Sequence, residues 1–367
     1  MFTELTAYGF NQSDIMAAQN ILENKKQDNL IPGRVIEARR ERFTLVCEKG
    51  EIHAELKGSF YHNLEEGGLY PVTGDFVLAR YNNTGASLID SVLPRRSEFS
   101  RVDFLGHAEG YAKNVREQVL ASNFDYVFIL SSLNHDLNLN RIARYLTASW
   151  QSNGFPVIVL TKADISDDIA AKTANVQKLN REVPVIAVSS KTGSGLSELE
   201  PFMEPGKTIV FLGSSGVGKS SLLNRLAGKE LMEVKEIRED DSKGRHTTTH
   251  RHLFRLSSGA MIIDTPGIRE LGLWDAREGL SMAFAEIEEL FPMCRFNNCS
   301  HKTEPGCAVL AALENQSLSE EQWKLYCAQM KETAFVSDHS AYLKQKHDFQ
   351  KSIARFSRDR KNKKEVY

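Results

Sequence analysis

The chain has 367 residues, of which 41% are hydrophobic and 26% are charged, and its formal net charge at pH 7 is −2. This length allows two or three domains with a substantial core, and the composition excludes a fibrous or largely disordered chain. No apolar run approaches the roughly 20 residues of a membrane span, and the N-terminus lacks a basic segment followed by an apolar one. We therefore expect a cytoplasmic protein that does not bind membranes.

The first quarter of the sequence predicts a small β-barrel. A short helix is expected at 14–26, followed by a turn at Pro32 and Gly33. The pattern then changes to five short alternating runs separated by glycines, at 33–39, 42–48, 51–56, 75–81 and 87–93. Five such strands within about 60 residues predict a barrel of the oligonucleotide-binding (OB) type, although an SH3-like barrel gives nearly the same pattern. One face of the barrel could bind RNA, and a structural or protein-docking role is also open.

Residues 94–119 are polar and basic with little periodicity, and we interpret them as a linker. Arg95, Arg96 and Arg101 could contact nucleic acid, but a solvated connection is the simpler interpretation. Beyond the linker, apolar strands alternate with helices in the manner of a parallel α/β sheet. We expect a barrel with its linker over 1–110, an α/β domain over 111–275 and a helical C-terminal domain over 276–367.

Two predicted strands of the α/β domain are followed by residues suited to a guanine base. Residues 161–164 have the form [NT]-K-x-D at the carboxyl end of a strand, where open α/β folds bind ligands. The Asp164 carboxylate can accept hydrogen bonds from N1–H and the 2-amino group of guanine, a donor pair that adenine lacks. Residues 189–191 match the [ST]-[SA]-K loop that holds the base. Each motif is weak alone, and together they predict base contacts from Thr161, Lys162, Asp164, Ser189, Ser190 and Lys191.

The segment GSSGVGKS, residues 213–220, fits the phosphate-loop pattern G-x-x-x-x-G-K-[ST]. An apolar run of strand type precedes it, and leucines at helical spacing follow it, so a glycine-rich turn that binds nothing is the weaker interpretation. The glycines let backbone N–H groups converge on an anion, and the helix start adds partial positive charge. Lys219 would reach the β- and γ-phosphates, and Ser220 would ligate Mg²⁺. The expected contacts are Gly213, Ser214, Ser215, Gly216, Val217, Gly218, Lys219, Ser220 and Ser221.

The two segments after the phosphate loop resemble nucleotide switches. GRHTTT, residues 244–249, has the threonines expected of a first switch, where one hydroxyl completes Mg²⁺ coordination; we favour Thr248, with Thr247 as the alternative. MIIDTPG, residues 261–267, predicts a strand followed by D-x-x-G. Asp264 would approach Mg²⁺ through water, and the Gly267 amide would face the γ-phosphate.

The order of these motifs is unusual. In an ordinary small GTPase the phosphate loop comes first and the base motifs come last, whereas here both base motifs precede the phosphate loop. A circularly permuted sheet can assemble the same pocket, because the pocket depends on where its residues lie in space and not on their order in the chain. The chain then leaves this domain directly after the second switch, so whatever follows is tethered to an element that moves.

Cys294, Cys299, His301 and Cys307 form the pattern C-x₄-C-x-H-x₅-C. Three thiolates and one imidazole are a complete tetrahedral set for a structural zinc ion, and no position remains for a catalytic water. Ordinary buried thiols are the alternative interpretation. The remaining cysteines, Cys47 and Cys327, are isolated in the sequence and are expected to be core or surface thiols.

Helices are expected at 309–315 and 318–335, and the chain ends in a basic stretch. Residues 344–364 contain nine Lys or Arg against two Asp, and Phe349 and Phe356 are spaced seven apart among the cations. This pattern predicts an amphipathic helix with a basic side that contacts rRNA phosphates, with a solvated charged face as the alternative.

The combination of barrel, TKAD, SSK, GSSGVGKS, GRHTTT, DTPG and the cysteine-histidine cluster resembles the circularly permuted ribosome-assembly GTPases of the RsgA (YjeQ) family over nearly the whole chain. The resemblance implies a GTP hydrolase acting in late maturation of the small (30S) ribosomal subunit. Such a protein would bind 16S rRNA, be stimulated by the subunit and be released on GTP hydrolysis. It would be a monomer that uses Mg²⁺ with GTP and holds one structural zinc ion.

The resemblance also bears on catalysis. Residue 268 is isoleucine, where Ras-like enzymes have the glutamine that orients water. The family's catalytic histidine corresponds to His246, while His250 and His252 are close enough to compete, and all three could instead belong to an RNA-facing loop. Other functions remain open: action on a different ribonucleoprotein, a P-loop small-molecule kinase, or an RNA-binding module in which the nucleotide is only structural.

Overall fold

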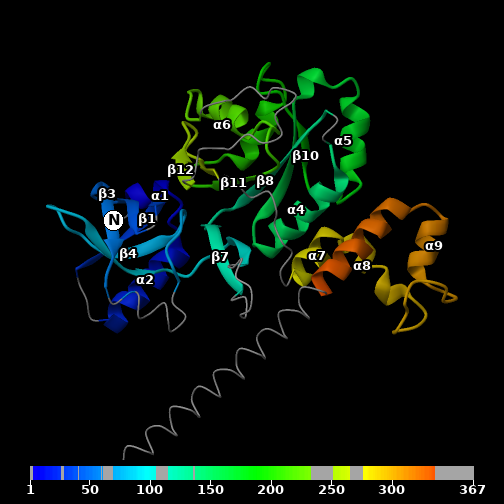
Figure 1. Cartoon of the computed structure of the whole chain (residues 1–367), viewed down its shortest axis with the longest axis horizontal. Coiled ribbons are helices and arrows are strands. Elements are labelled where there is room, and N and C mark those ends of the chain that lie inside the picture. The colour runs from blue at the N-terminus through cyan, green and yellow to red at the C-terminus, as the bar shows by residue number, and fades with distance from the viewer. Residues whose placement is uncertain are drawn as a thin grey trace, which may run out of the picture. The chain divides into compact units, whose positions relative to one another are not determined.

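The computed structural model describes residues 3–25, 29–39, 41–58, 60, 69–104, 115–134, 137–232, 251–264 and 276–334 (Figure 1). The chain divides into two compact units, residues 1–272 and residues 273–367. Among the described residues, no helix has both the length and the apolar character needed to cross a bilayer.

The N-terminal part of the first unit is a five-stranded barrel, which confirms the predicted architecture. Strands β1 to β5 pair in the order β1-β2-β3-β5-β4, and β4 closes the barrel by pairing with β1. The pairing of β3 with β5 is parallel and the others are antiparallel, a Greek-key arrangement of the OB type. The elements are α1 (Thr3–Ala7), α2 (Gln12–Lys25), β1 (Leu30–Arg39), β2 (Arg42–Cys47), β3 (Gly50–Leu56), β4 (Phe76–Arg80) and β5 (Ser87–Val92).

The turn expected at Pro32 and Gly33 is wrong, because both residues lie inside β1. At Pro32, β1 pairs with β4 alone, and its pairing with β2 begins at Gly33. A proline is tolerated there because the strand has a partner on one side only. A Cβ on Gly33 would lie 3.3 Å from the Val46 carbonyl oxygen, so this glycine permits close strand packing.

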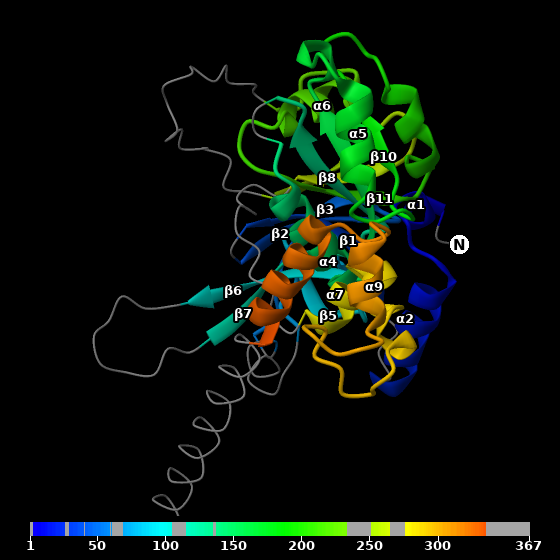
Figure 2. The same cartoon turned by 90° about the vertical axis from the view of Figure 1, so that its right-hand side faces the viewer.

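The interpretation of 94–119 as a linker is also wrong where the structure describes this segment. Strands β6 (Glu98–Phe104) and β7 (Val115–Ser122) pair antiparallel as a two-stranded ribbon, which Figure 2 shows clearly. Arg95, considered above for nucleic acid, is buried against Asp75, with nitrogen–oxygen distances of 2.7 and 2.8 Å. The sequence indicates these strands only weakly, because a two-stranded ribbon buries little apolar surface. Its strands therefore do not need alternating apolar and polar residues.

The second part of this unit is a mostly parallel sheet, whose strands run from teal through green to yellow in Figure 1. Its strands follow the order β10-β9-β8-β11-β13-β12, in which only β12 is antiparallel to its neighbour. The central strands are apolar along their length because both faces are covered. The elements are β8 (Tyr126–Ser132), α4 (Leu139–Gln151), β9 (Phe155–Thr161), η1 (Ala163–Ile165), α5 (Ile169–Gln177), β10 (Val185–Ala187), η2 (Leu196–Phe202), β11 (Thr208–Leu212), α6 (Lys219–Ala227), β12 (Arg251–Arg255) and β13 (Met261–Asp264).

The barrel and the parallel sheet are joined through β1 and β12. These strands pair antiparallel, with Glu37 opposite His252 and Ala38 opposite Arg251, so that one continuous sheet runs through both parts. Arg34 reinforces this junction from a fully buried position. Its guanidinium donates to the carbonyls of Gly74 at 3.2 Å and of Asn123 at 2.9 Å. Burial lowers the pKa of Arg34 to about 9, which still leaves it charged at neutral pH.

The second unit is helical in the part that the structure describes. Helices α7, α8 and α9 are joined by turns, and a further helical stretch covers residues 320–334. The predicted helices at 309–315 and 318–335 are therefore both confirmed over their described residues. The basic stretch 344–364 lies outside the described residues. The elements are α7 (Arg277–Ala283), α8 (Ala285–Glu288), η3 (Phe291–Met293) and α9 (Ala308–Glu314).

Gly74 provides a test of the junction between barrel and sheet. It has a φ of +101°, and an added Cβ would lie 2.1 Å from the Ser122 carbonyl oxygen. Gly74→Ala should therefore lower the free energy of unfolding by roughly 3 kcal/mol or more, as measured by urea denaturation. Gly50 is the matched control, because its φ is +89° and nothing lies within 4 Å of an added Cβ. Equal losses in the two variants would contradict the close approach at Gly74.

Candidate functional site

The predicted nucleotide motifs meet at one edge of the parallel sheet. Strands β9, β10, β11 and β13 run in the same direction, so their carboxyl ends lie along one edge. The base motif 161–164 follows β9, the loop 189–191 follows β10, and the phosphate loop follows β11. Asp264 is the last residue of β13. Segments up to about 100 residues apart in the chain therefore share the edge at which open α/β folds bind ligands.

The phosphate loop has the geometry of an anion cradle. It leads from β11 into α6, whose N-cap is Gly218 with a φ of +102°. A Cβ on Gly213 would lie 2.7 Å from the Leu130 carbonyl oxygen, so only glycine fits at the start of the loop. The Lys219 ammonium donates to the carbonyls of Gly213 at 2.6 Å and Ser214 at 2.8 Å, bridging the loop. The first N–H groups of α6 are oriented to receive a phosphate.

A hydrogen bond joins the base motif directly to the phosphate loop. The Thr161 hydroxyl at the end of β9 donates to the Val217 carbonyl, and Thr161 is 2% exposed. Strand β8 lies between β9 and β11 in the sheet, so this bond spans the sheet edge above β8. Val217 is itself buried in the sheet core. The positions of base motif and phosphate loop are thus fixed relative to each other.

The two base motifs are also linked to each other. The Ser189 hydroxyl donates to Oδ1 of Asp164 at 2.7 Å and accepts a hydrogen bond from the Thr192 N–H at 3.1 Å. Ser189 is fully buried, whereas Asp164 is exposed. Within the described residues, Oδ2 of Asp164 makes no hydrogen bond. The Ser189 hydroxyl therefore fixes the carboxylate through Oδ1, and the carboxylate retains acceptor capacity for the N–H groups of a guanine base.

The remaining predicted residues are placed as follows. Lys162 adopts the left-handed region with a φ of +59°, between β9 and η1. Ser190 and Lys191 lie on the loop after β10, and Ser220 and Ser221 lie in the first turn of α6. His252 lies in β12 opposite Asp264, and burial lowers the pKa of its imidazole. His246, Thr247, Thr248, His250 and Gly267 lie outside the described residues.

The second unit contains the predicted cysteine-histidine cluster. The ligand atoms of Cys294, Cys299, His301 and Cys307 all lie within 4.8 Å of one another, and the His301 Nδ1 is 3.4 Å from the Cys307 sulfur. Donors around a tetrahedral zinc ion are roughly 3.8 Å apart, given zinc–sulfur bonds of about 2.3 Å. Burial raises the pKa of Cys299 to about 11, and the neighbouring Cys307 and Cys294 add to the shift. Three thiols and one imidazole at these separations are a donor set that fits a divalent cation such as zinc.

Glu304 supports this cluster, and sequence reasoning missed it. Its carboxylate accepts hydrogen bonds from the Ser300 hydroxyl and from the N–H groups of Ser300 at 2.8 Å, Lys302 at 3.0 Å and Thr303 at 3.1 Å. These bonds, that of the Ser300 hydroxyl foremost, hold the pKa of Glu304 well below its usual range. In the sequence, the only feature that could have indicated this role is that Glu304 lies between two predicted metal ligands, His301 and Cys307. Glu304 thus orders the backbone that carries His301, whose φ is +58°.

Comparisons with known proteins show the family to which this chain belongs. A family of RsgA GTPases matches residues 92–274, and a family described as 50S ribosome-binding GTPase matches residues 208–355. The small ribosomal subunit biogenesis GTPase RsgA 1 of Listeria innocua is 43% identical over 323 residues, which cover 88% of this chain and 89% of the relative. The chain belongs to the RsgA GTPase family. The predicted resemblance is therefore confirmed, and so is the assignment as a GTP-hydrolysing enzyme.

Other RsgA relatives and solved structures support the same conclusion. The RsgA of Methanosarcina acetivorans is 41% identical over 297 residues, covering 81% of this chain and 79% of that protein. YjeQ from Thermotoga maritima has a TM-score of 0.62 at 25% identity, covering 83% of this chain and 98% of that one. YloQ, described as a circularly permuted GTPase, has a TM-score of 0.60 at 25% identity, covering 85% and 96%. The permuted order inferred from the motifs is thus confirmed.

Removing the Thr161 hydroxyl tests the link between the base motif and the phosphate loop. Thr161→Val would leave the buried Val217 carbonyl without this donor, so we expect roughly tenfold weaker GTP binding, measured by fluorescence titration. Thr147→Val is the matched control, because Thr147 is equally buried and its hydroxyl donates to the Ala143 carbonyl within α4, at 3.2 Å, away from the phosphate loop. An unchanged dissociation constant in Thr161→Val would show that the bond does not organise the site.

Proposed function

We propose that this GTPase acts in late maturation of the small (30S) ribosomal subunit, where it binds 16S rRNA and is released when GTP is hydrolysed. The observation that carries the nucleotide part is the convergence of the phosphate loop with Asp164, held by Ser189 at 2.7 Å, on one sheet edge. The ribosomal part is supported by relatives named small ribosomal subunit biogenesis GTPase at 40–43% identity. Such a role belongs to the cytoplasm, and we propose that the protein acts there as a monomer.

The site residues divide the work of phosphoryl transfer to water. Lys219 and the N–H groups of the phosphate loop neutralise the β- and γ-phosphates, and Asp164 selects guanine. Ser220 and Thr248 would hold Mg²⁺, with Asp264 approaching it through water, and this ion would supply charge neutralisation during transfer. The Gly267 amide would face the γ-phosphate. Positioning and electrostatics thus provide the rate, as in other P-loop GTPases.

Water activation needs a residue other than glutamine, because position 268 is isoleucine. We propose His246 as the group that orients the attacking water. Its position in GRHTTT, directly before the threonines of the first switch, supports this role. Since neither a glutamine nor an evident arginine finger is present, we expect slow intrinsic hydrolysis that the bound subunit accelerates.

The other parts of the chain provide binding surfaces. We propose that the barrel with its following segment over 1–110 and the basic stretch 344–364 contact rRNA; in the sequence they precede and follow the GTPase domain at 111–275. The region 276–367 would hold one structural zinc ion on Cys294, Cys299, His301 and Cys307. With four protein donors there is no open position for a substrate, so the ion would stabilise a short segment that has little core of its own.

The decisive experiment compares GTP hydrolysis with isolated small and large subunits, because one matching family is described by the 50S subunit. We expect small subunits to raise turnover well above the intrinsic rate and large subunits to have little effect. His246→Ala should abolish most of this stimulation while GTP affinity stays unchanged, since the residue would act on water and not on the nucleotide. Stimulation by large subunits alone would overturn the proposed function. Unchanged turnover in His246→Ala would remove that residue from the mechanism.

Metal content tests the zinc proposal. Purified protein should carry about one zinc ion per chain, measured by atomic absorption, and Cys299→Ser should lose most of it. Cys327→Ser is the matched control, because Cys327 is a free thiol outside the cluster. Chelation should unfold the second unit while GTP binding by the first unit persists. Wild-type protein without zinc, or a Cys299→Ser variant with full zinc content, would contradict the assignment.

A further inference from the structure

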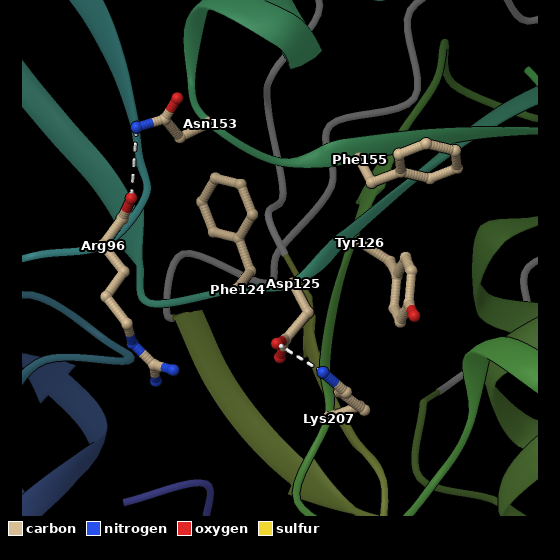
Figure 3. A pocket seen from close by; sticks show the side chains of 7 residues that line it. All are labelled: Arg96, Phe124, Asp125, Tyr126, Asn153, Phe155 and Lys207. Atoms are coloured by element: carbon tan, nitrogen blue, oxygen red, sulfur yellow. Dashed lines mark hydrogen bonds and ion pairs between the residues drawn. The ribbon is translucent and has the colours of Figure 1, made fainter. Parts of the chain in front are cut away.

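A pocket lies at the opposite edge of the parallel sheet from the nucleotide site (Figure 3). Tyr126 and Phe155 are the first residues of β8 and β9, and Lys207 directly precedes β11. The pocket is therefore separated from Thr161 by the seven-residue length of β9, roughly 20 Å. Its volume is about 390 Å³. No part of the GTPase mechanism uses it.

One wall of the pocket is aromatic. Phe155 is 36% exposed although it is a large apolar side chain. It meets Tyr126 edge-on at 6.3 Å and Trp150 edge-on at 5.4 Å between ring centroids. Neither contact is stacked, so the ring is held in place while part of its surface stays open to a planar ligand. An exposed, immobilised ring is the kind of surface on which nucleic-acid bases stack.

The polar groups of the pocket are fixed next to this wall. Asp125 accepts a hydrogen bond from the Thr208 N–H at 2.8 Å. It also pairs with the Lys207 ammonium at 3.2 Å, as Figure 3 shows. Lys207 also lies 6.0 Å from the centre of the Tyr126 ring. Its ammonium has three donors, and Asp125 occupies one of them within the described residues. A positively charged donor is thus available at the rim for a phosphate.

The rim opposite Lys207 carries an amide. Asn153 adopts the left-handed region with a φ of +61°, and its amide nitrogen donates to the Arg96 carbonyl at 3.4 Å. The turn is tightly packed, since a Cβ on Gly154 would lie 2.6 Å from the Phe124 ring. The Asn153 amide oxygen makes no hydrogen bond within the described residues. It can accept a hydrogen bond from the edge of a base.

We propose that this pocket binds a single unpaired nucleotide of an RNA chain, with the base against Phe155 and a flanking phosphate at Lys207. The size of the pocket is at the lower end of the range for small ligands, roughly 300–1,000 Å³, which suits a single nucleotide. A ring face, a cation and an amide acceptor together match the three parts of a nucleotide. The proposal rests on the proposed function only in taking RNA as the natural partner.

The test uses the full-length protein with GDP filling the first nucleotide site. A single-stranded RNA of eight nucleotides that contains 4-thiouridine is bound and photocrosslinked, and we expect crosslinks in the tryptic peptide 145–162. Locating the crosslink is necessary because the barrel and the C-terminal stretch are also expected to bind RNA. Phe155→Leu should reduce this crosslink about tenfold, whereas Phe155→Tyr, which keeps an aromatic face, should retain it.

Lys207→Ala should weaken binding of the same RNA, measured by fluorescence anisotropy, and should reduce its salt dependence by about 0.7 in the log–log slope, as expected for one phosphate contact. Lys178→Ala, at the exposed C-cap lysine that follows α5, is the matched control and should change neither quantity. Thermal denaturation of each variant shows whether the fold is intact. If Phe155→Leu does not fold, the comparison of Lys207→Ala with Lys178→Ala decides whether the pocket binds RNA.

Several outcomes would overturn the proposal. Crosslinks confined to other peptides, or equal crosslinking of Phe155→Leu and wild type, would remove RNA from this pocket. Competition by free uridine monophosphate as effective as that by the RNA would make it a mononucleotide site. Loss of subunit binding in Phe155→Leu with unchanged RNA crosslinking would assign the pocket to a protein partner. If small subunits still stimulate hydrolysis in any of these cases, the proposed function stands and only the pocket assignment fails.

Discussion

The hydrogen bond from the Thr161 hydroxyl to the Val217 carbonyl links the base motif to the phosphate loop, and the proposed nucleotide site is built around this link. It connects the end of β9, which carries the proposed base motif, with the loop proposed to bind the phosphates, across the intervening β8. A ligand that contacts both segments needs them at one fixed separation, and a buried side-chain bond supplies it. Because the bond depends on spatial position alone, the permuted order of the chain leaves the pocket intact.

The same principle extends from the site to the barrel. Arg34, Gly74 and Asn123 bring together a barrel strand, the loop before β4 and the start of the parallel sheet. The pairing of β1 with β12 adds backbone hydrogen bonds to these contacts. Strand β12 also pairs with β13, whose last residue is Asp264. The barrel is therefore separated by a single strand, β12, from the strand that ends at Asp264.

Much of this arrangement follows from local sequence, and the exceptions have physical causes. The phosphate loop, the base motifs and the zinc-type cluster were predictable because each needs particular residues at fixed spacing. Pro32 was misassigned as a turn because its effect depends on whether a strand lies on both sides, which only the tertiary structure decides. The β6–β7 ribbon and the burial of Arg95 were missed for a related reason, since Asp75 is 20 residues away in sequence. Glu304 acts through backbone N–H groups, which no residue pattern displays.

The pairing of β1 with β12 also determines how this protein can be divided. A GTPase fragment that begins after the barrel would leave the outer edge of β12 as a row of unpaired N–H and C=O groups. Open edges of this kind recruit strands from other molecules and lead to aggregation. The barrel therefore serves as the protective border of the sheet, and evolutionary or engineered exchange of this module would have to replace that border as well as any RNA-binding surface.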